Sequence, residues 1–116
     1  MIELATTPFA RMRGLLGRNA LPPGQALLIR PCNAIHTLGM RFAIDARFYN
    51  KAGQRVREVL AIRPGRWWVW GSRRAWCVLE SAAGDPTFAA LTQLPPALLG
   101  KASVQAARAE SREGER

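Results

Sequence analysis

The sequence is poor in the residues and runs that mark several common classes of protein. Its 116 residues include only two cysteines and one histidine, and no apolar run approaches the roughly 20 residues that a bilayer span requires. The chain also begins without the basic and long apolar regions of a signal peptide. Composition therefore excludes a membrane span and a multidomain enzyme, and it favours a cytoplasmic chain with reduced thiols. A bond between Cys32 and Cys77 stays open only for adjacent strands in an oxidising compartment.

Acidic residues are also scarce, and the charge balance is strongly positive. Seventeen lysines and arginines face eight acids, which gives a net charge of +9, and fifteen of the basic residues are arginine. Residues 101–116 contribute only one unit of that charge, so the excess belongs to the preceding part of the chain. A positive surface favours anionic partners such as nucleic acid, anionic lipid or an acidic protein. The alternative is solvated charge that arises from an arginine-rich base composition.

Two helices are predicted by capping residues and apolar spacing. Residues 8–16 form the first, because Thr7 can cap its start and proline suits the first helical position. Phe9, Met12 and either Leu15 or Leu16 recur at about helical spacing, so we expect them to face the core. Residues 85–94 suit a second helix, which an aspartate followed by proline can open.

Short strands dominate the rest of a globular chain that is 48% apolar. Segments with the alternating or β-rich composition of strands are residues 26–29, 35–38, 41–49, 55–62 and 75–81. Residues 67–70 are either extended or a loop. We expect one domain over residues 1–100, and a tail that is a frayed helix or disordered over residues 101–116. The pattern indicates an α+β fold: a small, mainly antiparallel β domain, built as a strongly twisted sheet or a partly closed barrel, with one or two short helices.

Polar residues inside apolar strands are the first candidates for a site. Asp45 and Glu80 are acids in such positions, which is costly unless a cation or a backbone donor meets them. An ion pair with an arginine is the expected role, and a polar-ligand pocket is the alternative. The candidate partners are Arg11, Arg18 and Arg41. His36 reads either as a partly buried imidazole bonded to the backbone or to Asp45, or as a ligand contact in a concave face.

The thiols and the imidazole allow two further hypotheses. Cys32 and His36 are four residues apart, which spans roughly 13 Å in an extended segment, so we expect neither a metal site nor a cofactor. Nucleophilic catalysis would need Cys32 or Cys77 beside His36, with an acid such as Asp45 to orient the imidazole. Because Cys77 lies in an apolar strand, where thiols are usually inert, a small Cys/His-dependent hydrolase or transferase is the rival reading.

Arginine and tryptophan gather between residues 63 and 74. The residues of this Arg/Trp patch are Arg63, Arg66, Trp67, Trp68, Trp70, Arg73 and Arg74. Such a composition stacks bases, sits at a membrane interface or forms a contact with a partner protein. Packing and solvated charge are the plainer alternative, and we expect Trp76 simply to join the core.

Three linked segments resemble one prokaryotic family. Residues 32–40 (CNAIHTLGM), followed by Phe42-Ala-Ile-Asp45 and by Phe48-Tyr-Asn, resemble the signature of the family called domain of unknown function 192. Residues 11–18 with Leu21 are similar to its opening helix and loop, and Val78-Leu79-Glu80 with Gly84 to its later strand and turn. The resemblance spans roughly residues 3–84.

The resemblance implies a small, mainly β domain with a short helix, and no established reaction. The residues that it carries over are Arg11, Gly14, Arg18, His36, Thr37, Met40, Asp45, Glu80 and Gly84. Members usually close with a Gly-Asp turn and a final strand, which residues 94–100 replace here. Members are often exported or lipid-anchored, whereas this chain starts almost at the domain, which favours either the cytoplasm or a sequence that has been shortened.

These observations favour a binding module without catalytic activity. Its site would be a polar cluster of His36, Thr37 and Asp45, joined by Arg11 and Glu80, near an aromatic rim. The matched positions are polar and scattered, yet they lack a complete catalytic set. The ligand or partner protein is not specified by the sequence, and binding of nucleic acid through the Arg/Trp patch is the second alternative.

Overall fold

The computed structural model describes residues 1–100; the predicted tail, residues 101–116, lies outside them. Strands predominate in this part of the chain, with one α-helix and two single turns of 3-10 helix. In order, the elements are β1 (Ile2–Ala5), α1 (Pro8–Arg13), β2 (Ala26–Ile29), β3 (Ala34–Ile35), β4 (Ile44–Tyr49), β5 (Arg55–Ile62), β6 (Val69–Trp70), β7 (Cys77–Ala82), η1 (Pro86–Phe88) and η2 (Pro96–Leu98). The predicted fold class, a small and mainly antiparallel β-rich domain, is confirmed.

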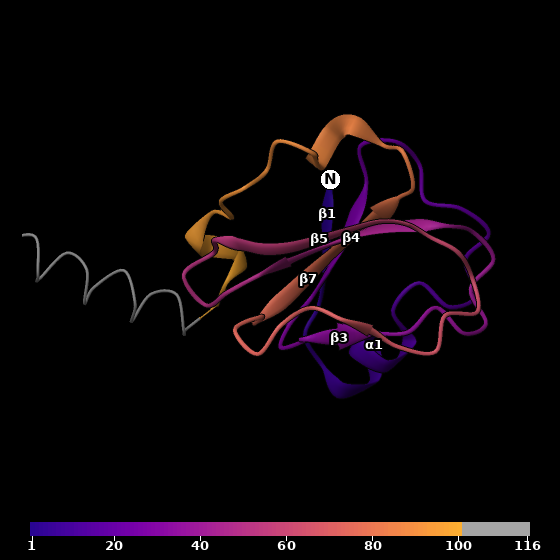
Figure 1. Cartoon of the computed structure of the whole chain (residues 1–116), viewed down its shortest axis with the longest axis horizontal. Helices are drawn as coiled ribbons and strands as arrows, with labels where there is room; N and C mark the ends of the chain where they lie inside the picture. The colour runs from indigo at the N-terminus through magenta and orange to yellow at the C-terminus, as the bar shows by residue number, and fades with distance from the viewer. Residues whose placement is uncertain (101–116) are drawn as a thin grey trace, which may run out of the picture.

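Five strands form one mixed sheet in the order β1-β2-β7-β4-β5, and β3 pairs with β6 in a separate two-stranded ribbon (Figure 1). Every pairing is antiparallel except that of β1 with β2, which is parallel. The predicted strands 26–29 and 55–62 match β2 and β5. Strand β1 was not predicted, because only four residues form it and Glu3 and Leu4 are exposed.

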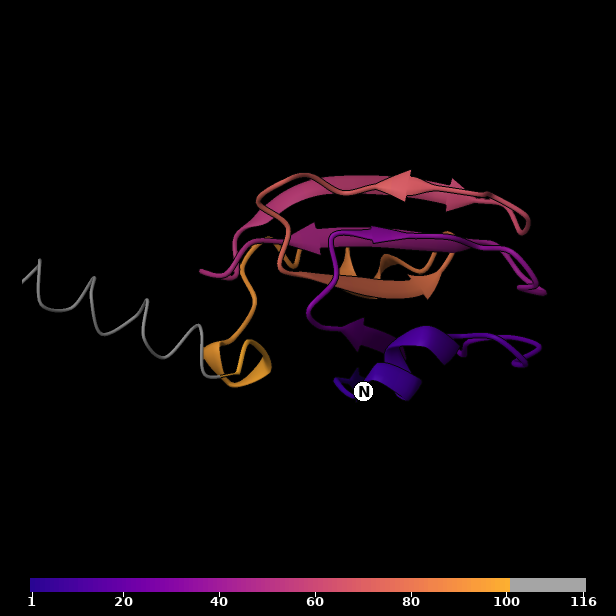
Figure 2. The ribbon, with the colours of Figure 1, turned by 90° about the horizontal axis from the view of Figure 1, so that it is seen from below.

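The central strands are buried on both sides, and alternate residues pack against different layers. On the first face, Leu27 of β2, Ala46 of β4 and Val78 of β7 join one apolar cluster. On the second face, Leu28 of β2 and Leu79 of β7 join another. Figures 1 and 2 show α1 and the β3–β6 ribbon on the same side of the sheet, which is the first face.

The first face is covered by the ribbon, by α1 and by the loops beside them. Ile35 and Val69 of the ribbon are buried in its cluster, and the ribbon lies so close that a Cβ at Gly71 would come 2.3 Å from the Phe48 ring. The prediction that Phe9 and Met12 face the core is wrong, because these residues are 70% and 72% exposed, whereas Leu15 is buried as predicted. The helix ends at Arg13, three residues earlier than predicted, so the apolar spacing does not continue on one face.

The second face is covered by residues 86–99, with Phe88, Leu94 and Leu99 buried against the sheet. The helix predicted over residues 85–94 is wrong, since only η1 forms there. The physical reason is that the later backbone groups of this segment bond to the β4–β5 hairpin. The amide of residue 55 donates to the Thr92 carbonyl, and the Leu94 amide donates to the Gly53 carbonyl.

Candidate functional site

A pocket of about 470 Å³ opens on the first face of the sheet, and we call it the α1 pocket. It is bounded by α1, by the end of β2, by residues 31–36 and by Glu80 of β7. Its volume lies in the range of small-molecule sites. Three of the five predicted ligand-binding residues, Arg11, His36 and Glu80, line it together with Cys32.

Glu80 is the buried acid of this pocket. Its register partners are Leu27 on β2 and Ala46 on β4, so its side chain leaves the middle of the sheet between two apolar neighbours. The residue is only 4% exposed, and within residues 1–100 its carboxyl group forms neither a hydrogen bond nor an ion pair. Burial alone raises the pKa of Glu80 to about 7. A carboxyl group that lacks a protein partner thus lies at the wall of a cavity.

Arginines stand on the other side of the same pocket, on α1. The helix starts because the Thr7 hydroxyl accepts from the Ala10 amide at 3.1 Å, and it ends at Gly14, whose φ of +49° favours glycine. Arg11 and Arg13, in its last turn, are exposed and line the pocket. Their guanidinium groups have no hydrogen-bond or ion-pair partner in the described part of the chain. Positive charge therefore borders the pocket where α1 meets solvent.

Cys32 and His36 also line the α1 pocket, and the charges of both Glu80 and Arg11 act on the Cys32 thiol. The Cys32 thiol donates to the Ala34 carbonyl at 3.1 Å, and burial raises the pKa of this thiol to about 11. The exposed His36 accepts at Nδ1 from the Leu38 amide at 3.2 Å, which leaves Nε2 to carry the proton of the neutral ring. At neutral pH the thiol is protonated, so it lacks the thiolate that a nucleophile needs.

Cys77, the other candidate nucleophile, lies on the second face of the sheet. It is fully buried in the second cluster, and burial raises its pKa to about 12. It does not line the α1 pocket with His36. Both cysteines are free thiols.

Thr37, although next to His36, points away from solvent and ties down the turn between β5 and β6. Its hydroxyl donates to the Arg63 carbonyl at 2.7 Å and accepts from the Arg66 amide at 2.9 Å. Its own amide donates to the Arg66 carbonyl, and its carbonyl accepts from the Gly65 amide. The residue is completely buried, and its polar groups form hydrogen bonds with the backbone of residues 63–66.

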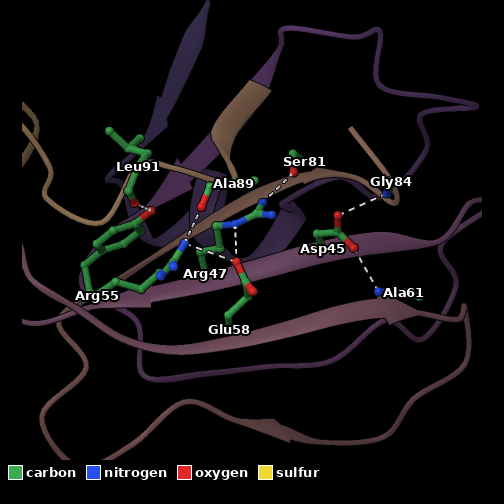
Figure 3. Close-up of polar contacts among 10 residues, drawn as sticks. Asp45, Arg47, Arg55, Glu58, Ala61, Ser81, Gly84, Ala89 and Leu91 are labelled. Atoms are coloured by element: carbon green, nitrogen blue, oxygen red, sulfur yellow. Dashed lines mark hydrogen bonds and ion pairs between the residues drawn. The ribbon is translucent and has the colours of Figure 1, made fainter. Parts of the chain in front are cut away.

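Asp45 faces the opposite side of the sheet from Glu80. Its register partner on β7 is Ser81, the neighbour of Glu80, and cross-strand partners share a face. Its two carboxylate oxygens accept from the Ala61 amide at 2.8 Å and from the Gly84 amide at 3.0 Å (Figure 3). Ala61 has a φ of +53° at a register shift between β4 and β5, so Asp45 stabilises a β-bulge.

The expected ion pairs of Asp45 and Glu80 with arginine are therefore wrong. Arg18 pairs with Glu3 at 2.7 Å, and Arg41 donates to the side chain of Asn19 at 2.6 Å. Backbone amides satisfy Asp45 instead, and Glu80 has neither kind of partner. The partly buried position expected for His36 is wrong, because the residue is exposed; its ring bonds to a backbone amide and not to Asp45. The alternative, that His36 contacts a ligand, stays a prediction.

The second face carries a polar network that the sequence did not predict (Figure 3). The buried Arg47 donates to Glu58 at 2.8 Å and to the Ser81 hydroxyl at 3.3 Å, and Arg55 also donates to Glu58 at 3.1 Å. The Tyr49 hydroxyl donates to the backbone of the covering segment. Arg47 and Glu58 are register partners, so pairing of the predicted strands 41–49 and 55–62 was the available indication of this ion pair.

The Arg/Trp patch divides into two parts. Trp67, Trp68 and Trp70 are 76%, 57% and 40% exposed beside the turn that Thr37 holds. Arg73 and Arg74 instead line a second hollow of about 380 Å³ with Lys51 and Trp76. Trp76 is half-buried and packs against the second cluster, with the Lys51 ammonium 5.4 Å from its ring.

Two absences concern the described residues alone. Nowhere among residues 1–100 do three or more His, Cys, Asp or Glu side chains gather as metal ligands would. In the same range no helix has the length and apolar character needed to cross a bilayer.

The fold and the pocket define the class of protein: a small β-rich domain with a cavity of small-molecule size on one sheet face. A protein of unknown function from Novosphingobium aromaticivorans DSM 12444 has a similar fold, with a TM-score of 0.66 and 18% identity over 72% of this chain and 63% of that one. This chain thus spans under two thirds of that protein. A "putative transcription regulator" from Sinorhizobium meliloti 1021 gives a TM-score of 0.67 and 24% identity, over 81% of this chain and 75% of its own.

The family follows from the sequence itself. The model of DUF192, described as "Uncharacterized ACR", matches residues 1–91, and the chain belongs to this family. The resemblance found in the motifs is therefore confirmed. No curated protein matches the sequence significantly.

Proposed function

We propose that this protein is a small-molecule binding module whose site is the α1 pocket. The observation that carries the proposal is Glu80, a carboxyl group that is 4% exposed, lines a cavity of about 470 Å³ and lacks a partner within residues 1–100. Every fully buried side-chain oxygen and nitrogen within residues 1–100 has a hydrogen-bond partner, so the unpaired Glu80 carboxyl oxygens open onto the pocket and are not sealed in the core. A ligand supplies the missing partner.

Roles for the other site residues follow from their contacts. Arg11 and His36 line the pocket and contact the ligand, whereas Thr37 and Asp45 hold loops and are positioning residues. Catalysis by a thiol is not part of the proposal, since Cys32 stays protonated at neutral pH. A cytoplasmic location, where both thiols stay reduced, is retained as a prediction.

A fragment screen against the whole chain tests this function. Fragments that bind should shift the amide NMR signals of Gly14 and of residues 32–36. The Glu80→Gln substitution should weaken the affinity of these fragments. Glu3→Gln is the matched control, because Glu3 is an exposed acid paired with Arg18 outside the pocket. If hits map elsewhere, or if Glu80→Gln and Glu3→Gln behave alike, the α1 pocket is not the site.

A second candidate function is nucleic-acid binding through the Arg/Trp patch. The exposed tryptophans beside Arg63 and Arg66 favour it, and so does the description of the Sinorhizobium protein. It predicts affinity for an oligonucleotide that falls steeply with salt and is lost in the Arg63→Ala/Arg66→Ala variant. Binding that is absent or independent of salt would remove it.

A further inference from the structure

The α1 pocket is polarised, with opposite charges held apart on its two sides. On the inner side the Glu80 carboxyl group has only burial acting on it, and no cation lies within ion-pair distance. On the outer side Arg11 and Arg13 lack carboxylate partners, although the Arg11 charge is felt at the Cys32 thiol. The two sides thus share one cavity without neutralising each other.

Part of the pocket wall is apolar. Leu15, Ile29 and Ile35 are buried members of the first core cluster, and all three line the pocket. Such a wall offers no hydrogen bonds to a polar ligand body, so it favours an aliphatic one. It also lowers the local dielectric, which strengthens any charge pairing at Glu80.

We infer that the α1 pocket takes a small zwitterion, in which an apolar body separates an ammonium group that meets Glu80 from a carboxylate group that meets Arg11 and Arg13. This inference rests on the proposed function and adds the ligand class to it. An ammonium group supplies donors to a carboxylate that has none, and a guanidinium group pairs with a carboxylate through a fork of N–H donors. The ammonium and carboxylate groups of the ligand must be separated, because Glu80 and the two arginines line one pocket without forming an ion pair.

Four probes separate the parts of this inference: 6-aminohexanoate, its isomer norleucine, hexylamine and hexanoate. Isothermal titration with the full chain should give 6-aminohexanoate an affinity about tenfold or more above each of the others. Norleucine has the same atoms with its charges adjacent, so it tests the separation. Hexylamine and hexanoate each lack one charge.

Variants assign each end of the probe to its residue. Glu80→Gln should weaken 6-aminohexanoate and hexylamine about tenfold, whereas Arg11→Gln should weaken 6-aminohexanoate and leave hexylamine unchanged. Arg57→Gln is the control for loss of an exposed arginine, since Arg57 lies on β5 and lines neither hollow. Carbon-13 NMR of the Glu80 carboxyl group should show its pKa fall when 6-aminohexanoate binds, because an ammonium group favours the charged form.

Two results overturn the inference, and they leave the proposed function standing. One is failure of 6-aminohexanoate to bind, and the other is tightest binding of hexanoate or norleucine. The proposed function falls separately, when the fragment screen yields no ligand that depends on Glu80.

Discussion

Asp45 and Glu80 are both acids buried in adjacent strands of one sheet, and they differ in almost every contact. Asp45 is 3% exposed and accepts two backbone hydrogen bonds on the second face. Glu80 is 4% exposed and has no partner on the first face within the described chain. Burial is the same, so satisfaction of hydrogen bonds is what separates a structural acid from a candidate binding group.

The wider surroundings of the two acids differ in the same way. On the second face Arg47, Glu58 and Ser81 bond to one another, so the polar groups there complete each other (Figure 3). On the first face Arg11 and Glu80 line one pocket and remain apart. A protein can stabilise a polar layer by pairing it internally, or it can leave charges unpaired for a ligand at a cost in stability.

Removal of Asp45 is the largest expected effect. Asp45→Ala leaves the Ala61 and Gly84 amides without their charged acceptor, so the free energy of unfolding should fall by about 4 kcal/mol. Urea denaturation measures the loss. Asp45→Asn keeps one acceptor oxygen and should lose about half as much. A loss below about 1 kcal/mol for Asp45→Ala would remove the contrast with Glu80.

Glu80→Gln should raise the free energy of unfolding, in contrast to Asp45→Ala, and the size of the increase should depend on pH. The pKa of Glu80 is about 7 in the folded protein against an ordinary 4.5, so the folded state binds the proton more tightly. Wild-type stability should therefore fall as pH rises from 4.5 through about 7, by about 3 kcal/mol in total. The glutamine variant lacks this penalty, so it should match the wild type near pH 4.5 and exceed it above pH 8.

Urea denaturation of both proteins across that pH range measures the difference. Glu3→Gln is the control, because its ion pair with Arg18 lowers the pKa of Glu3. The stabilisation from the Glu3–Arg18 ion pair is lost as the pH falls through the folded pKa of Glu3, which is the reverse of the trend at Glu80. This stabilisation is small because the ion pair is exposed to solvent. A stability difference between wild type and Glu80→Gln that does not change with pH would mean that Glu80 is not buried as a lone carboxyl group.

Local patterns predicted much of the fold. Strands β2 and β5 follow apolar or alternating runs between turns, and their limits match the predicted ones. The first helix was predicted too long because Gly14 takes a φ of +49°, which apolar spacing does not reveal. The second predicted helix failed because residues 89–94 bond to a hairpin that is distant in sequence.

The candidate site depended on register, which spacing along the chain does not determine. Glu80 meets the α1 pocket because β7 pairs with β2 and β4 in registers that place it beside Leu27 and Ala46. Alternation along a strand at residues 41–49 implies that Asp45 and Ala46 lie on opposite faces, but it does not say which face Asp45 shares with Glu80. The polar residues of the candidate site were therefore identified from the sequence. Their placement on two opposite faces of the sheet was not predicted.

Thr37→Val is expected to reduce stability by less than Asp45→Ala does. It extends the comparison of paired and unpaired polar groups to a residue beside the α1 pocket. Thr37 lies beside His36, yet its hydroxyl is fully paired with the backbone of residues 63 and 66. Valine has the same shape without the hydroxyl, so one buried carbonyl and one amide lose their partner, and stability should fall by about 2 kcal/mol.

Thermal or urea denaturation measures that loss, and Leu38→Val, at an exposed neighbouring position, is the control. Because Thr37 does not line the α1 pocket, the affinity of any pocket ligand should stay within about twofold of wild type. Substitutions at the adjacent residues His36 and Thr37 would then have different effects: a change at His36 alters ligand affinity, and a change at Thr37 alters stability. A loss of affinity in Thr37→Val without a loss of stability would place Thr37 among the ligand contacts and move the site toward the Arg/Trp patch.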